Sequence, residues 1–139
     1  MKSLLVANRG EIAIRILRAA AELGVPSVSV HSEDDAACLH TRHADRVRRL
    51  RGVGPAAYLD AEQLVAVALE TGCDAVHPGY GFLAERADFA RRCAEAGLRF
   101  VGPRPEVLEL FGDKSRARRH AEACGVPVLP GTDQLESGE

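Results

Sequence analysis

The chain has 139 residues, a formal net charge of −2, and 46% hydrophobic and 27% charged residues. This composition suits one globular domain with a real core, and the charge gives no reason to expect a nucleic-acid or membrane partner. No apolar run approaches the roughly 20 residues of a membrane-spanning helix, and residues 8–11 interrupt the apolar start too early for a signal peptide.

The first part of the chain predicts a strand, a helix and a second strand. Residues 4–7 form a short, continuous apolar run, as expected for a strand buried on both faces. Residues 11–23 carry apolar side chains three and four positions apart, which predicts one buried helix face made of Ile12, Ile16, Ala19 and Leu23. Gly24 and Pro26 end this helix, and residues 28–31 are expected to form the second strand.

The rest of the chain continues this alternation. The predicted elements are a short helix at 36–40, a strand at 45–50, a glycine- and proline-rich loop at 52–55, a helix at 61–71 capped by Asp60, a strand at 75–77, a helix at 87–96, a strand at 99–101, helices at 105–110 and 113–124, and an extended segment at 126–129. The tail at 131–139 has no apolar pattern and is expected to fray.

Strands separated by helices indicate parallel β-α-β units, because a parallel pair of strands needs a crossover connection. We therefore expect an α/β fold with an open, mainly parallel sheet and helices on both faces. Ligands of such sheets lie at the carboxyl ends of the strands. The two loops with the most unusual chemistry at those ends are residues 8–11 and 77–82.

The first loop, residues 8–11, superficially resembles a dinucleotide-binding turn, because a strand, a glycine and a helix start follow one another. It has a single glycine, Gly10, and the bulky Ile12 follows shortly after. Since a dinucleotide site uses further glycines to let the backbone approach the pyrophosphate, we expect no NAD or FAD here. The alternative is a tight strand-to-helix turn in which Arg9 and Glu11 make structural hydrogen bonds.

The second loop, residues 77–82, is more distinctive, because two glycines and a proline give it a rigid backbone path. Tyr80 and Phe82 are expected to project from it, with Glu85 one turn later. A tyrosine between glycines can present its ring face and hydroxyl to a ligand. The spacing equally allows Tyr80 to pack over the sheet edge, and both interpretations stand at this point.

A third candidate is Lys114 in the Gly-Asp-Lys sequence that opens the predicted helix at 113–124. A lysine beside free helix N–H groups is suited to phosphate, although an isolated lysine of this kind also occurs on solvated surfaces. The nearby basic side chains are interpreted mainly as a solvated helix face; they are Arg116, Arg118, Arg119 and His120.

The sequence contains no catalytic set: we find no metal-spaced histidine and cysteine cluster, no HExxH and no nucleophile elbow. His40 and His43 lack an obvious third ligand, so a surface role is expected for both. The cysteines form no CxxC pair and are predicted to be buried, reduced thiols of a cytoplasmic protein; they are Cys38, Cys73, Cys93 and Cys124.

Taken together and in order, the motifs resemble the biotin carboxylase component of biotin-dependent carboxylases. The similar segments are residues 5–13, 77–85, 100–103, 112–114 and 125–131. The resemblance covers residues 4–132 and implies a Rossmann-like domain, here residues 1–112, with residues 113–139 leading toward an ATP-grasp domain. It also implies the reaction, in which ATP and bicarbonate carboxylate biotin on a biotin carboxyl carrier protein.

The resemblance assigns roles to four residues. Tyr80 would lie near biotin, Lys114 would reach the ATP phosphates, and Arg18 and Glu22 would sit at a homodimer contact. The i,i+4 spacing of Arg18 and Glu22 also allows a plain intrahelical pair. The full-length enzyme would use ATP, biotin and Mg²⁺, and none is expected to bind tightly to this chain alone.

Several positions depart from the family pattern, namely Arg86, Phe111 and the arginines that precede Gly54. The family's metal-binding and bicarbonate-binding residues belong to later segments, so we expect these 139 residues alone to be inactive. A free-standing interaction module and the N-terminal domain of another ATP-grasp ligase are the alternatives. The acyl acceptor stays open among acetyl-CoA, propionyl-CoA, pyruvate and urea, although Ala13 favours an acyl-CoA carboxylase over a pyruvate carboxylase.

Overall fold

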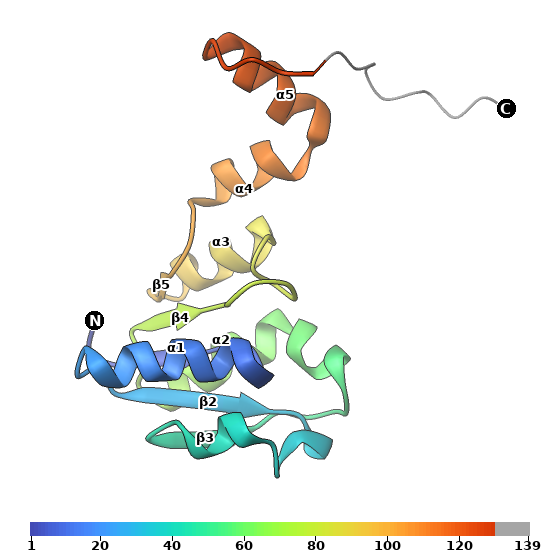
Figure 1. Cartoon of the computed structure of the whole chain (residues 1–139). Helices are drawn as coiled ribbons and strands as arrows, with labels where there is room; N and C mark the ends of the chain where they lie inside the picture. The colour runs from blue at the N-terminus through green and yellow to red at the C-terminus, as the bar shows by residue number, and fades with distance from the viewer. Residues whose placement is uncertain (130–139) are drawn as a thin grey trace, which may run out of the picture.

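The computed structural model describes residues 1–129, in which five parallel strands form one sheet in the order β3-β2-β1-β4-β5 (Figure 1). This confirms the predicted parallel α/β sheet. The strands are β1 (Leu4–Val6), β2 (Ser27–His31), β3 (Arg46–Arg49), β4 (Ala75–His77) and β5 (Arg99–Phe100). The helices are α1 (Gly10–Glu22), α2 (Ala61–Glu70), α3 (Ala87–Glu95), α4 (Pro105–Gly112) and α5 (Lys114–Ala123).

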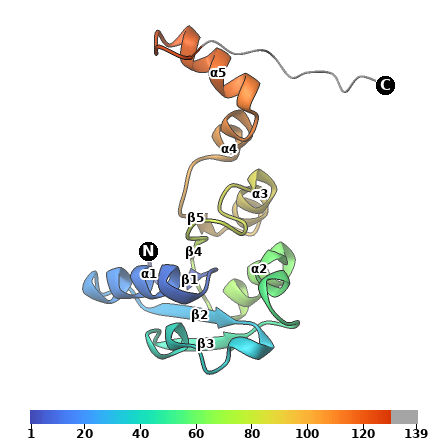
Figure 2. The ribbon, with the colours of Figure 1, turned by 45° about the vertical axis from the view of Figure 1, so that its right-hand side comes forward.

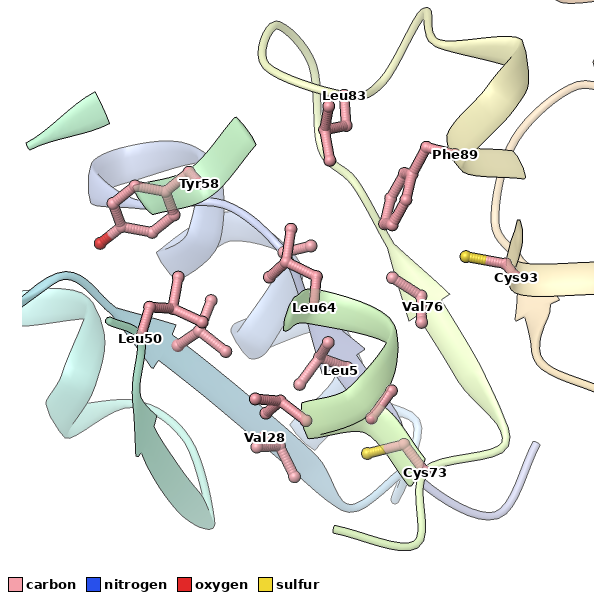
Figure 3. Packing of buried hydrophobic residues seen from close by; sticks show 14 of the residues in the cluster. Leu5, Val28, Leu50, Tyr58, Leu64, Cys73, Val76, Leu83, Phe89 and Cys93 are labelled. Carbon is pink, nitrogen blue, oxygen red and sulfur yellow. The ribbon is translucent and has the colours of Figure 1, made fainter. Parts of the chain in front are cut away.

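Helices cover both faces of the sheet, as the sequence predicts. On one face, α1 packs against Leu4 and Val6 of β1 and Ala75 of β4. On the other face, α2 and α3 enclose the larger cluster around Leu5 and Val76, which Figure 3 shows. Successive residues of β1 thus face opposite hydrophobic layers, which explains why this strand is apolar throughout.

The buried face of α1 is not the predicted one. The predicted line of Ile12, Ile16, Ala19 and Leu23 was wrong, because Leu23 is 78% exposed and the fully covered positions are Ala13, Leu17 and Ala20. Two alanines at the contact let the helix backbone approach the sheet closely. The larger Ile16, together with Ala19 and Leu23, instead lines an open apolar hollow with Met1 and Val25.

The segments that flank β3 also differ from the prediction. Residues 36–40 were expected to form a helix, whereas two short 3-10 turns form at Glu33–Asp35 and Leu39–Arg42. The loop expected at 52–55 leads into a third turn, Pro55–Leu59, which buries Tyr58. The strand β3 forms despite its arginines because it lies at the sheet edge, where exposed charges also discourage pairing with another chain.

The last two helices extend away from the sheet. No residue of α4 or α5 is fully buried, and Figures 1 and 2 show α5 beyond α4, which itself lies against α3. Residues 126–129, predicted to be extended, form no helix or strand. The predicted frayed tail at 131–139 lies outside the described residues. Within residues 1–129, no helix combines the length and the apolar character needed to cross a bilayer.

Candidate functional site

The two loops singled out from the sequence meet at the carboxyl ends of β1 and β4, which are neighbours in the sheet. Asn8, at the end of β1, is fully buried. Its side-chain amide donates to the carbonyl oxygens of Pro78 at 2.7 Å and of Tyr80 at 3.1 Å, and its own oxygen accepts from the Arg9 N–H at 2.9 Å. Asn8 therefore fixes the backbone of both loops at once.

Gly79 completes this junction because no other residue fits at its position. Its φ is +71°, and an added Cβ would lie 2.6 Å from Nδ2 of Asn8 and 2.7 Å from Cγ2 of Ile12. The Gly79 N–H donates to Nδ1 of His77 at 3.0 Å, so this nitrogen must be unprotonated. Burial lowers the pKa of His77, which keeps the imidazole neutral in that role.

Tyr80 stands out from the loop instead of packing over the sheet edge. Its side chain is 61% exposed, and its hydroxyl donates to Oε1 of Glu11 at 2.5 Å. That hydrogen bond raises the pKa of Tyr80, because the carboxylate stabilises the protonated phenol. The ring is thus accessible to solvent while its hydroxyl is held by α1.

Phe82 does not project from the loop as predicted. It adopts a left-handed backbone conformation with a φ of 44° and stacks on Tyr58, with the ring centroids 5.4 Å apart. Tyr58 comes from the short turn before α2 and was not recognised from the sequence. The stacking closes the top of the larger hydrophobic cluster, so Tyr80 is the aromatic side chain that this loop leaves exposed.

Arg9 makes a structural hydrogen bond, as expected for a tight strand-to-helix turn. Its partner is the carboxylate of Asp35, which was not identified from the sequence. Its guanidinium lies 2.6 Å from Oδ1 of the buried Asp35 and 5.8 Å from the centre of the Tyr58 ring. The Tyr58 hydroxyl also donates to Asp35, at 2.8 Å. Burial works to raise the pKa of Asp35, but hydrogen bonds from Tyr58 and Cys38 and the charge of Arg9 outweigh it and lower this pKa.

Lys114 begins α5, and among residues 1–129 its side chain has no hydrogen-bonded or ionic partner. Asp113 caps the helix by accepting from the Arg116 N–H at 3.0 Å. Glu85 lines a shallow hollow that ends at Gly112, and Gly112 also lines the next hollow, beside Lys114. Gly112 therefore borders both hollows, whereas Tyr80 lines neither of them, and no hydrogen bond joins Tyr80 to Lys114 within the described residues.

Arg18 and Glu22 lie exposed on the outer face of α1, where they line a polar hollow with Glu11 and Arg15. No ion pair forms between Arg18 and Glu22 in the described part of the chain, so the alternative of an intrahelical pair is not supported. On α5, by contrast, Arg118 pairs with Glu122 at 3.5 Å.

The remaining histidine and cysteine predictions need correction. His40 is fully buried, not on the surface, and its Nε2–H donates to the Val30 carbonyl oxygen at 3.1 Å. All four cysteines are free, but Cys124 is exposed and Cys38 is only half-buried. Within residues 1–129, no group of three or more histidine, cysteine, aspartate or glutamate side chains is arranged to hold a metal ion.

Residues 1–108 match the family model for "Biotin carboxylase, N-terminal domain". The chain belongs to the biotin carboxylase N-terminal domain family. It is 56% identical over 135 residues to the mitochondrial pyruvate carboxylase of Mus musculus, which covers 96% of this chain and 12% of the relative. A long-chain acyl-CoA carboxylase structure also matches, at 54% identity, so the comparisons support biotin-dependent carboxylases in general and do not select the acyl-CoA type among them.

Solved structures of biotin carboxylase domains agree with the fold. The biotin carboxylase domain of a single-chain bacterial carboxylase has a TM-score of 0.94 and 58% identity, over 99% of this chain and 32% of that chain. The Hydrogenobacter thermophilus 2-oxoglutarate carboxylase biotin carboxylase domain, a dimer bound to MgADP, ADP and bicarbonate, has a TM-score of 0.91 and 45% identity, over 99% and 30%. The chain thus spans less than a third of these relatives.

Proposed function

We propose that this chain forms the ligand-facing N-terminal part of a biotin carboxylase that uses ATP and bicarbonate to carboxylate biotin on a carrier protein. The observation that carries the proposal is the junction of the two signature loops. Asn8 binds both Pro78 and Tyr80 at the carboxyl ends of adjacent central strands, where ligands of open α/β sheets bind.

The proposed roles follow from the chemistry of the exposed side chains. Tyr80 offers an accessible ring face to biotin, and the fixed loop backbone orients it. Lys114 offers an ammonium group to the ATP phosphates, while Asp113 occupies one of the free N–H groups at the start of α5. Arg18 and Glu22 offer complementary charges to a second copy of the domain.

The described residues do not fit a Mg²⁺ site, because no cluster of carboxylates is available to coordinate the ion. We therefore derive no phosphoryl-transfer step from this chain. Its residues bind and orient, while an ATP-grasp domain following residues 113–139 would neutralise the transferring phosphate. On this division of labour, residues 1–112 form the domain proper, and a polypeptide of only these 139 residues is inactive.

A chimeric enzyme tests the proposed function. Residues 1–139 would replace the corresponding segment of the Hydrogenobacter thermophilus biotin carboxylase domain, and phosphate release from ATP would be measured with and without biotin and bicarbonate. We expect biotin-dependent release by the chimera and none by the 139-residue chain. A chimera that folds, binds ATP and yet shows no biotin dependence would refute the proposal, and so would activity of the chain alone.

Two finer assignments belong to the same proposal. The preference for an acyl-CoA acceptor rests on Ala13, which is fully buried against the sheet and so contacts no acceptor itself; assays of the complete enzyme with acetyl-CoA, propionyl-CoA and pyruvate would decide it. A cytoplasmic location is supported by four free thiols, which a reducing compartment preserves. Fractionation of the source cells would test the location.

A further inference from the structure

The hydrogen bond between Tyr80 and Glu11 links two elements that are 69 residues apart in the chain. Both residues are exposed, so neither needs this partner to avoid being buried without a hydrogen bond. The loop backbone is already fixed by Asn8 and by the tight packing of Gly79. The bond therefore adds nothing that the loop fold requires, and its remaining effect is to restrict the torsion of the tyrosine side chain.

We infer that Glu11 is a positioning residue that holds the Tyr80 ring so that its face, and not its hydroxyl, is presented to biotin. This inference rests on the proposed function. The single O–H of the phenol donates to the carboxylate and cannot donate to a ligand at the same time. The ring face stays free to pack against the C–H groups of the fused biotin rings, which need an apolar surface.

Glu11 also belongs to the outer face of α1. It lines the same polar hollow as Arg15, Arg18 and Glu22, the last two of which are the proposed contact residues for a second copy. The positive charge of Arg15 acts on the Tyr80 phenol in the direction opposite to that of Glu11. Glu11 therefore belongs both to the outer face of α1 and to the hydrogen bond that holds the exposed Tyr80 ring.

The contact itself can be tested without biotin, because the chain has two tyrosines and no tryptophan. Tyr58 is fully buried, which raises its pKa to about 12, whereas Tyr80 is exposed, so we expect Tyr80 to give the first transition in an ultraviolet titration of the phenols. Glu11→Ala is expected to lower the first transition. Glu62→Ala is the matched control, since Glu62 is likewise the second residue of its helix and exposed, and it should leave the titration unchanged. An unchanged first transition in Glu11→Ala overturns the inference.

The effect on biotin is tested in the chimeric enzyme. Glu11→Ala and Tyr80→Phe should each raise the KM for biotin about three- to tenfold, as expected for the loss of a typical solvent-exposed hydrogen bond, and should not raise the KM for ATP. The double variant should be no worse than either single variant, because both remove one interaction. Glu11→Gln, whose amide oxygen still accepts the phenol hydrogen, should restore most of the affinity.

Each other outcome contradicts the inference. Additive effects of Glu11→Ala and Tyr80→Phe show that the two residues act independently, and an equal effect of Glu62→Ala shows a general loss of negative charge at a helix start. A chimera without any biotin dependence refutes the proposed function and the role of Glu11 toward biotin together. The phenol titration would then still report separately whether Glu11 holds Tyr80.

Discussion

The side-chain amide of Asn8 lies 2.7 Å from the carbonyl oxygen of Pro78, 70 residues later in the chain. This contact joins the carboxyl ends of β1 and β4 and brings the first loop against the second. Every role proposed for Tyr80 depends on it, because the same amide also binds the Tyr80 carbonyl oxygen.

The close packing of Gly79 leads to the first prediction. Gly79→Ala should lower the free energy of unfolding by about 2–4 kcal/mol, because the added Cβ would clash with Asn8 and Ile12 and the left-handed backbone disfavours a side chain. Gly81→Ala is the matched control: it has the same φ of +71° but no atom within 4 Å of the added Cβ, so it should cost only about 1–2 kcal/mol. Urea unfolding of both variants measures the difference, and equal losses would show that the contact with Asn8 is unimportant.

The buried histidines predict how stability depends on pH. Burial lowers the pKa of both His40 and His77 from the ordinary value of 6.5. The folded state therefore binds fewer protons than the unfolded state just below pH 6.5, so the stability present above that pH falls as the solution is acidified toward the folded pKa values. Urea unfolding at pH 7.5, 6.5 and 5.5 should show this loss.

His77→Asn separates the contribution of His77 to this loss of stability from that of His40, because an amide oxygen can accept from the Gly79 N–H without titrating. It should reduce the decline in stability below pH 6.5. The same slope in the variant and the parent would exclude His77 as a contributor, and a stability that rises on acidification would contradict the burial of both imidazoles.

Much of the fold could be predicted from local patterns. Asp60 caps its helix as expected by accepting the Gln63 N–H, and Asp113, which was expected to begin a helix, caps α5 by accepting the Arg116 N–H. The buried face of α1 could not be predicted by size, because the sheet selects the small Ala13 and Ala20 for close contact and leaves larger neighbours partly outside. A hydrophobic pattern records which residues are apolar, but not how closely the next layer approaches.

The candidate site was predicted in part for a similar reason. The glycines around Tyr80 allowed either an exposed ring or a ring packed over the sheet edge, and the structure shows the exposed one. Its partner Glu11 and the carboxylate of Asp35 depend on contacts between distant segments, which no local spacing reveals. The polar run at 32–35 that follows β2 was the available signal for Asp35, because segments after parallel strands lie at the ligand edge of the sheet.

The cysteines predict a graded reactivity with a thiol reagent. Cys124 is exposed and should react first, whereas Cys73 and Cys93 are buried and should react only on unfolding; burial also raises the pKa of Cys93 to about 11. Cys38 should react slowly, because its hydrogen bond to Asp35 raises the pKa of the thiol. Timed labelling with mass spectrometry would rank the sites, and Cys124→Ser should remove the fast phase. Rapid labelling of Cys93 in the folded chain would contradict the packing of α3.

The separate roles proposed for Lys114 and Tyr80 are tested most directly by steady-state kinetics of the chimeric enzyme. Lys114→Ala should raise the KM for ATP about tenfold or more and leave the KM for biotin unchanged. Tyr80→Ala should raise the KM for biotin and leave the KM for ATP unchanged. Lys2, the only other lysine of the chain, supplies the control, and Lys2→Ala should change neither constant. If Lys114→Ala and Tyr80→Ala both leave the two KM values unchanged, as Lys2→Ala does, neither side chain faces its proposed substrate, and the proposed function is wrong.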